Sequence, residues 1–177
     1  MVKHRHIYLI GLSGSGKSSV GKIFAKEFKR SFVDIDKMIE KNAKKSITQI
    51  FEQDGEPAFR KMEAKTLQKL ARKSSEPKVI ALGGGTFDSP ANRKLAAASG
   101  ISIWLRCPIN ELSSRLKSIS DRPLLKGSNP ERQLSAQLRK RLRNYRKADL
   151  HISTSQMTPG QVSIEIIKTL KKKYAAD

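Results

Sequence analysis

The sequence is poor in cysteine and in long apolar runs. Cys107 is the single cysteine among 177 residues, so an internal disulfide is excluded and a reducing compartment is the simple expectation. The apolar run that follows the basic amino-terminal residues stops at Gly11, which makes it too short for an export signal or a membrane span. We therefore expect a cytoplasmic protein that does not bind a membrane.

Acidic residues are also scarce, with 16 Asp and Glu against 36 Lys and Arg and a formal charge of +20. Such basicity favours anionic partners, among them nucleotides, small carboxylates, nucleic acid and membrane surfaces. No helix-turn-helix signature and no Cys/His zinc spacing is present, so obligatory nucleic-acid binding is not expected. Most of the charges fall on what would be exposed helix faces, where a solvated surface is the ordinary interpretation.

Short apolar runs alternate with stretches of helical period along the chain. Helical period between strands predicts an α/β fold with a mostly parallel sheet covered on both faces. The last helix should have Thr158 as N-cap and Pro159 at its first position. At this length we expect one domain over residues 1–177. The five predicted strands are Ile7–Ile10, Phe32–Ile35, Val79–Leu82, Ile101–Leu105 and Leu150–Ile152.

Two segments exceed what simple alternation requires. More than forty residues separate the second and third predicted strands, and they include helical pieces at Ile47–Glu52 and Pro57–Arg72. The segment Ser118–Glu131 is rich in Gly, Pro and Asn and is predicted to be a loop between two helices. A loop of this length is usually functional or disordered, and we interpret it as a candidate lid.

The stretch Gly11–Ser18, GLSGSGKS, matches the phosphate-binding pattern G-x-x-x-x-G-K-[ST] between a predicted strand and a predicted helix. Its glycines let backbone N–H groups face phosphate oxygens, and the helix N-terminus adds its positive dipole. We expect Lys17 to reach the β- and γ-phosphates and the Ser18 hydroxyl to bind Mg²⁺. A Gly-Ser turn without ligand is disfavoured by the register of the motif and by both flanking elements.

Asp34 and Asp36 end the second predicted strand. Strand alternation would place both carboxylates on the same side, where one can serve Mg²⁺ through water and the other can bind an acceptor hydroxyl. The alternative is that Asp36 caps a helix starting at Lys37.

Further along the chain, Arg60 and Glu63 share a face of a predicted helix, and a surface ion pair is the ordinary interpretation.

Three consecutive glycines, Gly83 to Gly85, follow the third predicted strand, where backbone can approach a ligand closely. Arg122 lies in the candidate lid, and Arg141 shares a helix face with Tyr145. The guanine-reading motif N-K-x-D of GTPases is absent. A compact P-loop chain with an arginine-bearing lid favours a small-molecule kinase, although the P-loop alone does not choose the acceptor.

Together these features resemble the shikimate kinase family over nearly the whole chain. The P-loop alone is a broad signal, whereas the ordered set of motifs is specific. The resemblance implies a three-layer P-loop kinase fold with a five-stranded parallel sheet in the order 2-3-1-4-5. It also implies a substrate-binding insertion at about residues 36–64 and a lid at about 118–130. In family order, the motifs are the P-loop, Asp34-x-Asp36, GE..FR..E from Gly55, the three glycines, RPLL from Arg122 and L..R...Y..A from Leu138.

The resemblance further implies the activity, which is Mg²⁺-dependent transfer of the ATP γ-phosphoryl group to the 3-hydroxyl of shikimate, in aromatic amino-acid biosynthesis. The implied catalytic residues are Lys17, Asp36 and Arg122. Mg²⁺ is assigned to Ser18 and, through water, to Asp34. ATP and shikimate are the expected partners of a monomer. The implied ATP contacts are Gly14, Ser15, Gly16, Lys17, Ser18, Ser19, Arg115 and Arg122, and the implied shikimate contacts are Asp36, Arg60, Gly84 and Arg141.

Two other functions stay open at this point. Another small-metabolite kinase of the same fold, such as a gluconate-kinase-like protein, would hold its acceptor differently. A weakly catalytic P-loop module with a nucleic-acid-binding surface would be expected to lack Lys17, Asp36 or Arg122, and all three are present. The adenine contact is also open, because some members of the family place an arginine shortly before Pro159 and this chain does not. Met157 or a backbone group can pack on the base there.

Overall fold

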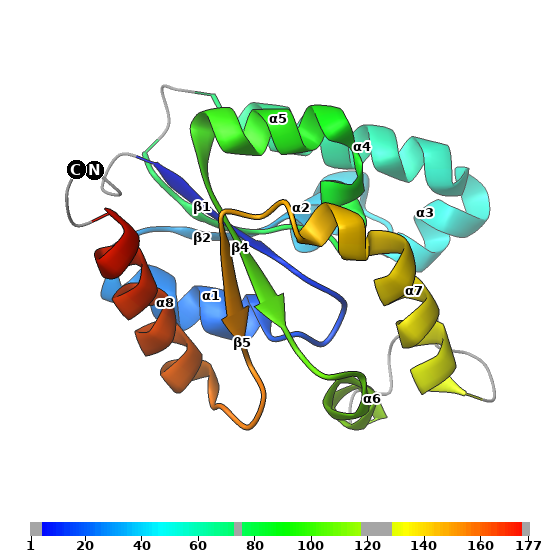
Figure 1. Ribbon diagram of the computed structural model, residues 1–177. Coiled ribbons are helices and arrows are strands. Elements are labelled where there is room, and N and C mark those ends of the chain that lie inside the picture. The colour runs from blue at the N-terminus through cyan, green and yellow to red at the C-terminus, as the bar shows by residue number, and fades with distance from the viewer. Residues whose placement is uncertain (1–4, 73–75, 118–128, 175–177) are drawn as a thin grey trace.

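A computed structural model describes residues 5–72, 76–117 and 129–174. Its centre is a sheet of five parallel strands in the order β2-β3-β1-β4-β5 (Figure 1). This order confirms the expected α/β architecture. The strands are β1 (His6–Ile10), β2 (Phe32–Asp34), β3 (Val79–Ala81), β4 (Gly100–Arg106) and β5 (Leu150–Ser153).

Helices connect successive strands and cover both faces of the sheet (Figure 1). Three of them, α2, α3 and α4, lie between β2 and β3 and account for the long segment there. The helices are α1 (Lys17–Glu27), α2 (Ile35–Ala43), α3 (Ile47–Gln53), α4 (Gly55–Leu70), α5 (Pro90–Ser99), α6 (Ile109–Lys117), α7 (Pro130–Tyr145) and α8 (Pro159–Tyr174), with a short 3₁₀ turn, η2 (Thr86–Asp88).

Alternate residues of the central strand β1 supply two separate apolar cores. Ile7 and Leu9 pack in one cluster with residues of α1 and α8, such as Phe24 and Ile166. Tyr8 and Ile10 point to the other face and pack in a second cluster with residues of α4, α5 and α7. Because β1 is fully buried, both faces are apolar, as expected for a parallel sheet between helical layers.

The end of β2 differs from the sequence prediction in a way that matters for the site. The strand stops at Asp34, and Ile35 already belongs to α2. Asp34 is the N-cap of this helix, and its Oδ1 accepts a hydrogen bond from the Lys37 N–H at 3.4 Å. Asp36 therefore lies in the first helical turn. Both sequence interpretations of Asp36, as a strand residue and as the helix cap, were wrong.

The segment predicted as a lid is described only at its end. Asn129 caps α7 by accepting a hydrogen bond from the Arg132 N–H at 3.0 Å, and Pro130 is the first residue of the helix. Asn129 and Pro130 are thus a helix start and not loop. Residues 118–128, with Arg122, lie outside the described residues. Among the helices that the structure describes, none has both the length and the apolarity needed to cross a membrane.

Candidate active site

The P-loop joins β1 to α1 and wraps around the helix N-terminus. Gly14 and Gly16 adopt φ values of 81° and 91°, a left-handed conformation that residues with a Cβ rarely adopt. The Lys17 side chain turns back over the loop, and its Nζ donates hydrogen bonds to the carbonyl oxygens of Gly11 and Leu12, both at 2.9 Å. The ammonium group is therefore held against the loop whose N–H groups are expected to face phosphate.

Ser18 and Asp34 bring a hydroxyl and a carboxylate together beside the P-loop. The Ser18 Oγ donates a hydrogen bond to Asp34 Oδ2 at 2.6 Å. Within the described ranges, no group of three or more His, Cys, Asp or Glu is arranged to hold a metal. A hydroxyl with one carboxylate nevertheless suits Mg²⁺, which usually keeps several waters and takes other ligands from substrate phosphates.

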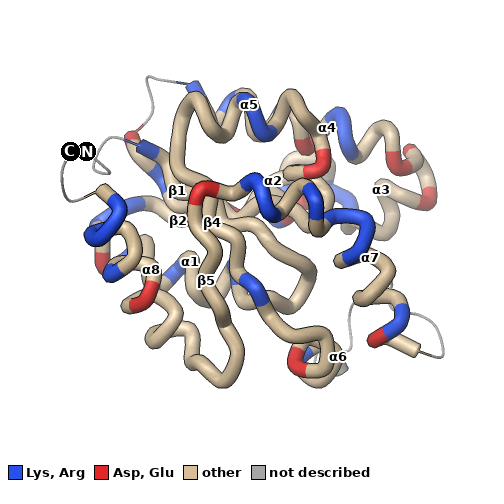
Figure 2. The backbone as a smooth tube through the Cα atoms, in the orientation of Figure 1, with Lys and Arg blue, Asp and Glu red and all other residues tan. Residues whose placement is uncertain are grey.

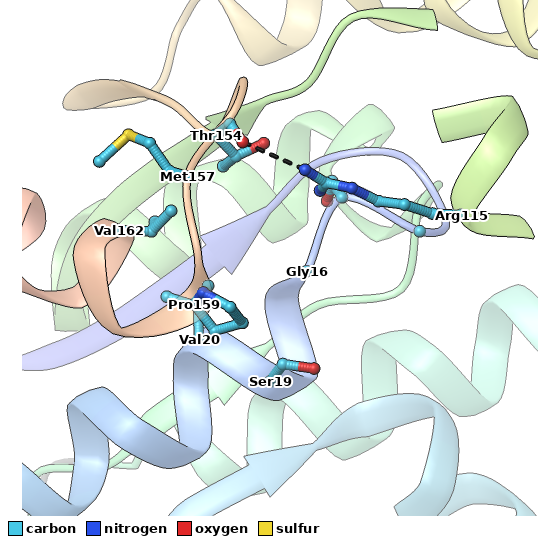
Figure 3. A pocket seen from close by; sticks show the side chains of 10 residues that line it. Gly16, Ser19, Val20, Arg115, Thr154, Met157, Pro159 and Val162 are labelled. Atoms are coloured by element: carbon cyan, nitrogen blue, oxygen red, sulfur yellow. Dashed lines mark hydrogen bonds between the residues drawn. The ribbon is translucent and has the colours of Figure 1, made fainter. Parts of the chain in front are cut away.

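A cavity of about 370 Å³ opens beside the P-loop on the side of α6 and α8 (Figure 3). Arg115 reaches from α6 to the carbonyl oxygen of Thr154, with its Nη2 at 3.2 Å, and also donates to Glu111 Oε2 at 3.0 Å. An arginine plane opposite apolar side chains is a surface on which a purine base can stack. The residues that line the cavity are Gly14, Ser15, Gly16, Ser19, Val20, Arg115, Thr154, Met157, Pro159 and Val162.

On the other side of the P-loop, the three glycines after β3 lie against charged side chains, Gly83 against the carboxylates of Glu63 and Asp36 and the next two glycines against arginines. A Cβ placed on Gly83 would lie 2.6 Å from Asp36 Oδ1, and one placed on Gly84 would lie 2.9 Å from Arg141 Nη1. A Cβ on Gly85 would lie 2.7 Å from Arg60 Nη1. Because none of these positions has a side chain, Asp36, Arg60 and Arg141 can converge on one short stretch of backbone.

The Arg60 guanidinium is held by a buried carboxylate. Arg60 Nη1 lies 2.5 Å from Glu63 Oε2, and the Glu63 side chain is only 1% exposed. Glu63 also accepts a hydrogen bond from the Thr86 hydroxyl. The sequence interpretation of a surface ion pair was therefore wrong for Glu63. The surface ion pair of Arg60 is instead with Glu56, whose side chain is 60% exposed and lies 2.8 Å from Arg60 Nη2.

Arg141 extends from α7 toward the glycines, and Asp88 of η2 holds its guanidinium at the Nε atom. Its Nε lies 3.4 Å from Asp88 Oδ2, and Asn144 donates a hydrogen bond to the other oxygen of Asp88 at 3.1 Å. Tyr145, one turn further along α7, donates its hydroxyl to the Gly84 carbonyl at 2.5 Å. Burial raises the pKa of Tyr145 well above its usual value, so the hydroxyl stays protonated as this bond requires.

Sequence reasoning missed Thr86, Asp88 and Asn144. All three act through contacts with residues distant in the chain, and none lies in a recognisable motif. A partial signal was present, because Thr86 and Asp88 follow the glycines directly and must lie near whatever the glycines face.

The family model described as "Shikimate kinase" matches residues 13–171. The chain belongs to the shikimate kinase family. A relative named "Shikimate kinase" from Sulfurihydrogenibium sp. is 38% identical, with 96% of this chain and 99% of the relative covered. Another of the same name from Prochlorococcus marinus is 41% identical over 95% of this chain and 88% of the relative.

Solved structures agree with this family membership. The shikimate kinase from Acinetobacter baumannii, solved in complex with shikimate, superposes with a TM-score of 0.91 at 33% identity and covers 98% of this chain and 96% of that one. A gluconokinase from Sinorhizobium meliloti gives a TM-score of 0.66 at 19% identity, with 99% of this chain and 97% of that chain covered. At that identity the likeness shows only the shared P-loop kinase fold.

Proposed function

We propose that this protein is a shikimate kinase, which transfers the γ-phosphoryl group of ATP to the 3-hydroxyl of shikimate. The observation that carries the proposal is the convergence of Asp36, Arg60 and Arg141 on Gly83–Gly85. Shikimate is a small carboxylate with adjacent hydroxyls. Two guanidinium groups suit the carboxylate because each presents parallel N–H donors, and Asp36 can accept hydrogen bonds from the hydroxyls.

The nucleotide is assigned to the P-loop and to the cavity beside it. Backbone N–H groups from Gly14 to Ser19 face the phosphates, and Lys17 neutralises charge on the β- and γ-phosphates. The adenine base fits between Arg115 and the apolar residues Met157 and Pro159, which line the cavity. Met157 thus takes part where some relatives place an arginine, since its flexible thioether packs well on an aromatic ring.

Mg²⁺ is the metal that the residues near the P-loop suit. Ser18 would bind it directly and Asp34 through water. When bound, Mg²⁺ neutralises charge on the transferred phosphate and on the leaving group. The Ser18 hydroxyl and the Asp34 carboxylate lie within a hydrogen bond of each other, so one ion can use both.

Phosphoryl transfer through a loose transition state needs alignment and charge neutralisation more than covalent help. Asp36 acts first by orienting the 3-hydroxyl toward the γ-phosphate and then by accepting its proton. Arg60 and Arg141 fix the ring by its carboxylate, so that the acceptor oxygen has one position. Arg122 keeps its expected role of closing on the phosphates, as a prediction for a residue outside the described ranges.

The acceptor is tested by ADP release from Mg-ATP with shikimate, quinate, gluconate or no addition. We expect turnover with shikimate alone, and its loss in Asp36→Asn and Arg60→Ala. Lys61→Ala is the matched control, because Lys61 is an exposed neighbouring cation on α4 and should leave activity unchanged. ADP release with gluconate and not with shikimate would overturn the proposal.

The proposal also includes a cytoplasmic location, a monomeric state, and a single domain with an acceptor-binding insertion and lid.

A further inference from the structure

The outer face of α7, with its C-cap residue Arg146, carries a line of four arginines that the kinase site does not use. Arg132, Arg139, Arg143 and Arg146 are all exposed. At 3.6 residues per turn their side chains fall within an arc of about 60° around the helix, and the line is about 21 Å long. Figure 2 shows blue segments along the α7 tube. We call this set the α7 arginine face.

The α7 arginine face has no charge partner within the part of the chain that the structure describes. None of its four arginines is in an ion pair there, and the one acidic residue of α7 is Glu131, in the first turn. Arg143 lies four residues after Arg139 and three before Arg146, spacings at which like charges repel and destabilise a helix. An anion bound along this face would remove that repulsion.

The kinase site lies on the opposite side of the same helix. Arg141 is about half a turn around the helix axis from Arg132, and its guanidinium faces Gly84. Tyr145 and Leu134, on the inner side of α7, are buried. Bound shikimate would therefore leave the α7 arginine face open to solvent, and the two can act independently.

We propose that the α7 arginine face binds the phosphodiester backbone of nucleic acid without reading its sequence. Arginine presents paired N–H donors that match phosphate oxygens, and a line of cations about 21 Å long can contact several successive phosphates of a polynucleotide. A lipid surface fits less well, because no apolar residue of α7 lies within this arc, the small Ala136 being just beside it, and amphipathic membrane helices insert larger apolar side chains.

The test measures binding of a fluorescein-labelled single-stranded RNA of random sequence by anisotropy over a series of salt concentrations. One variant combines Arg132→Gln, Arg139→Gln, Arg143→Gln and Arg146→Gln. Its matched control combines Lys168→Gln, Lys171→Gln, Lys172→Gln and Lys173→Gln, four exposed lysines of α8. Both lower the formal charge of +20 by four. Thermal melting and ADP release check that both are folded.

We expect the α7 variant to lose at least about tenfold in RNA affinity at moderate salt, with its salt slope reduced by about 3, since each neutralised phosphate contributes about 0.7 for single strands. The α8 control should lose much less. Equal losses in both variants would show that only total charge matters and would overturn the proposal, as would wild-type protein that does not bind the RNA.

Two further arms keep the outcome specific. The double variant Arg139→Gln and Arg143→Gln should reduce the salt slope by about half as much as the fourfold variant. It replaces the fourfold variant in the test if that variant does not fold. Vesicles containing phosphatidylserine should bind more weakly than RNA. If vesicles bind more tightly than RNA and the α7 variant abolishes that binding, the proposal is overturned, and the ligand of the α7 arginine face is a membrane surface. RNA binding is measured without ATP or shikimate, so failure of the proposed kinase activity would leave its result unaffected.

Discussion

The Glu63 carboxylate, buried to 1% exposure, lies 2.5 Å from the Arg60 guanidinium. The pair joins the solvent-facing part of α4 to the interior, since Glu63 also accepts a hydrogen bond from Thr86 of η2. Arg60 is thereby held at Gly85, where a Cβ would collide with its guanidinium. Arg60 is therefore held on its inner side by the buried Glu63 and on its outer side by the exposed Glu56, which accepts hydrogen bonds from Nε and Nη2.

Replacing Glu63 should therefore affect both substrate binding and stability. Glu63→Ala leaves the buried Thr86 hydroxyl without its acceptor, and we expect a loss of about 1–3 kcal/mol in the free energy of unfolding together with a raised KM for shikimate. Glu56→Ala removes the exposed partner of Arg60, and a surface pair contributes about 0–1 kcal/mol. Urea unfolding and steady-state kinetics on both variants test the difference; equal effects would contradict the assigned role of Glu63.

Asp88 should act by positioning Arg141. In Asp88→Ala the Arg141 guanidinium loses the contact at its Nε, so we expect KM for shikimate to rise about tenfold while kcat changes little. In Asp88→Asn a side chain of the same size stays beside Nε but the charge of the ion pair is lost, and KM should rise less than in Asp88→Ala. A fall in kcat with an unchanged KM for shikimate would be inconsistent with positioning.

Gly84→Ala should weaken acceptor binding in a folded protein. The added methyl group would meet Arg141 Nη1 at 2.9 Å, and the flexible end of this side chain can move aside at the expense of its contact with shikimate. We expect KM for shikimate to rise by about tenfold. Gly160→Ala is the matched control, because a Cβ there meets nothing within 4 Å and alanine favours the helix.

The nucleotide cavity predicts a separate effect on ATP. Arg115→Ala removes one wall of the cavity, and KM for ATP should rise about tenfold with KM for shikimate unchanged. Arg106→Ala is the control, since Arg106 is exposed and stacks on Trp104 at 5.5 Å outside this cavity. Equal effects of the two variants on ATP would argue against a base-binding role for Arg115.

His6 should make stability depend on pH just below neutrality. Burial, with Lys78 and Arg30 nearby, lowers the pKa of His6 below 6.5, and its Nδ1 accepts a hydrogen bond from the Lys78 N–H at 3.0 Å. Between the folded and the unfolded pKa the unfolded chain binds more protons, so stability is full above pH 6.5 and falls as the pH is lowered. His6→Asn, whose amide oxygen can accept the same bond, should flatten this part of the pH profile. The free energy of unfolding is measured by urea unfolding at each pH, and an unchanged dependence on pH in the variant would refute the role of His6.

Contiguous features of the chain were predictable from sequence. The P-loop is a single stretch with its own strand and helix, and alternating apolar runs predicted the sheet and its helical layers. Thr158 and Pro159 begin α8 as predicted, with the Thr158 hydroxyl accepting from the Gln161 N–H at 3.3 Å. Such signals are local, because they depend on neighbours within one turn.

Relationships between distant segments were not readable in the same way. The burial of Glu63 depends on η2 packing against α4, and the role of Asp88 depends on α7 returning over the glycines. The end of β2 was predicted one residue too late, at Ile35 instead of Asp34. The Asp34 side chain caps α2, so the helix begins at Ile35. Strand periodicity could not report a cap that competes with it.

The most direct test of the proposed activity is a proton–phosphorus correlation spectrum of the products formed from Mg-ATP and shikimate. We expect one new phosphate ester whose phosphorus couples to the proton on carbon 3 of shikimate, in equal amount to the ADP formed. ADP without a new ester, or an ester on another hydroxyl of shikimate, would contradict the assignment of Asp36, Arg60 and Arg141 as the groups that orient the acceptor.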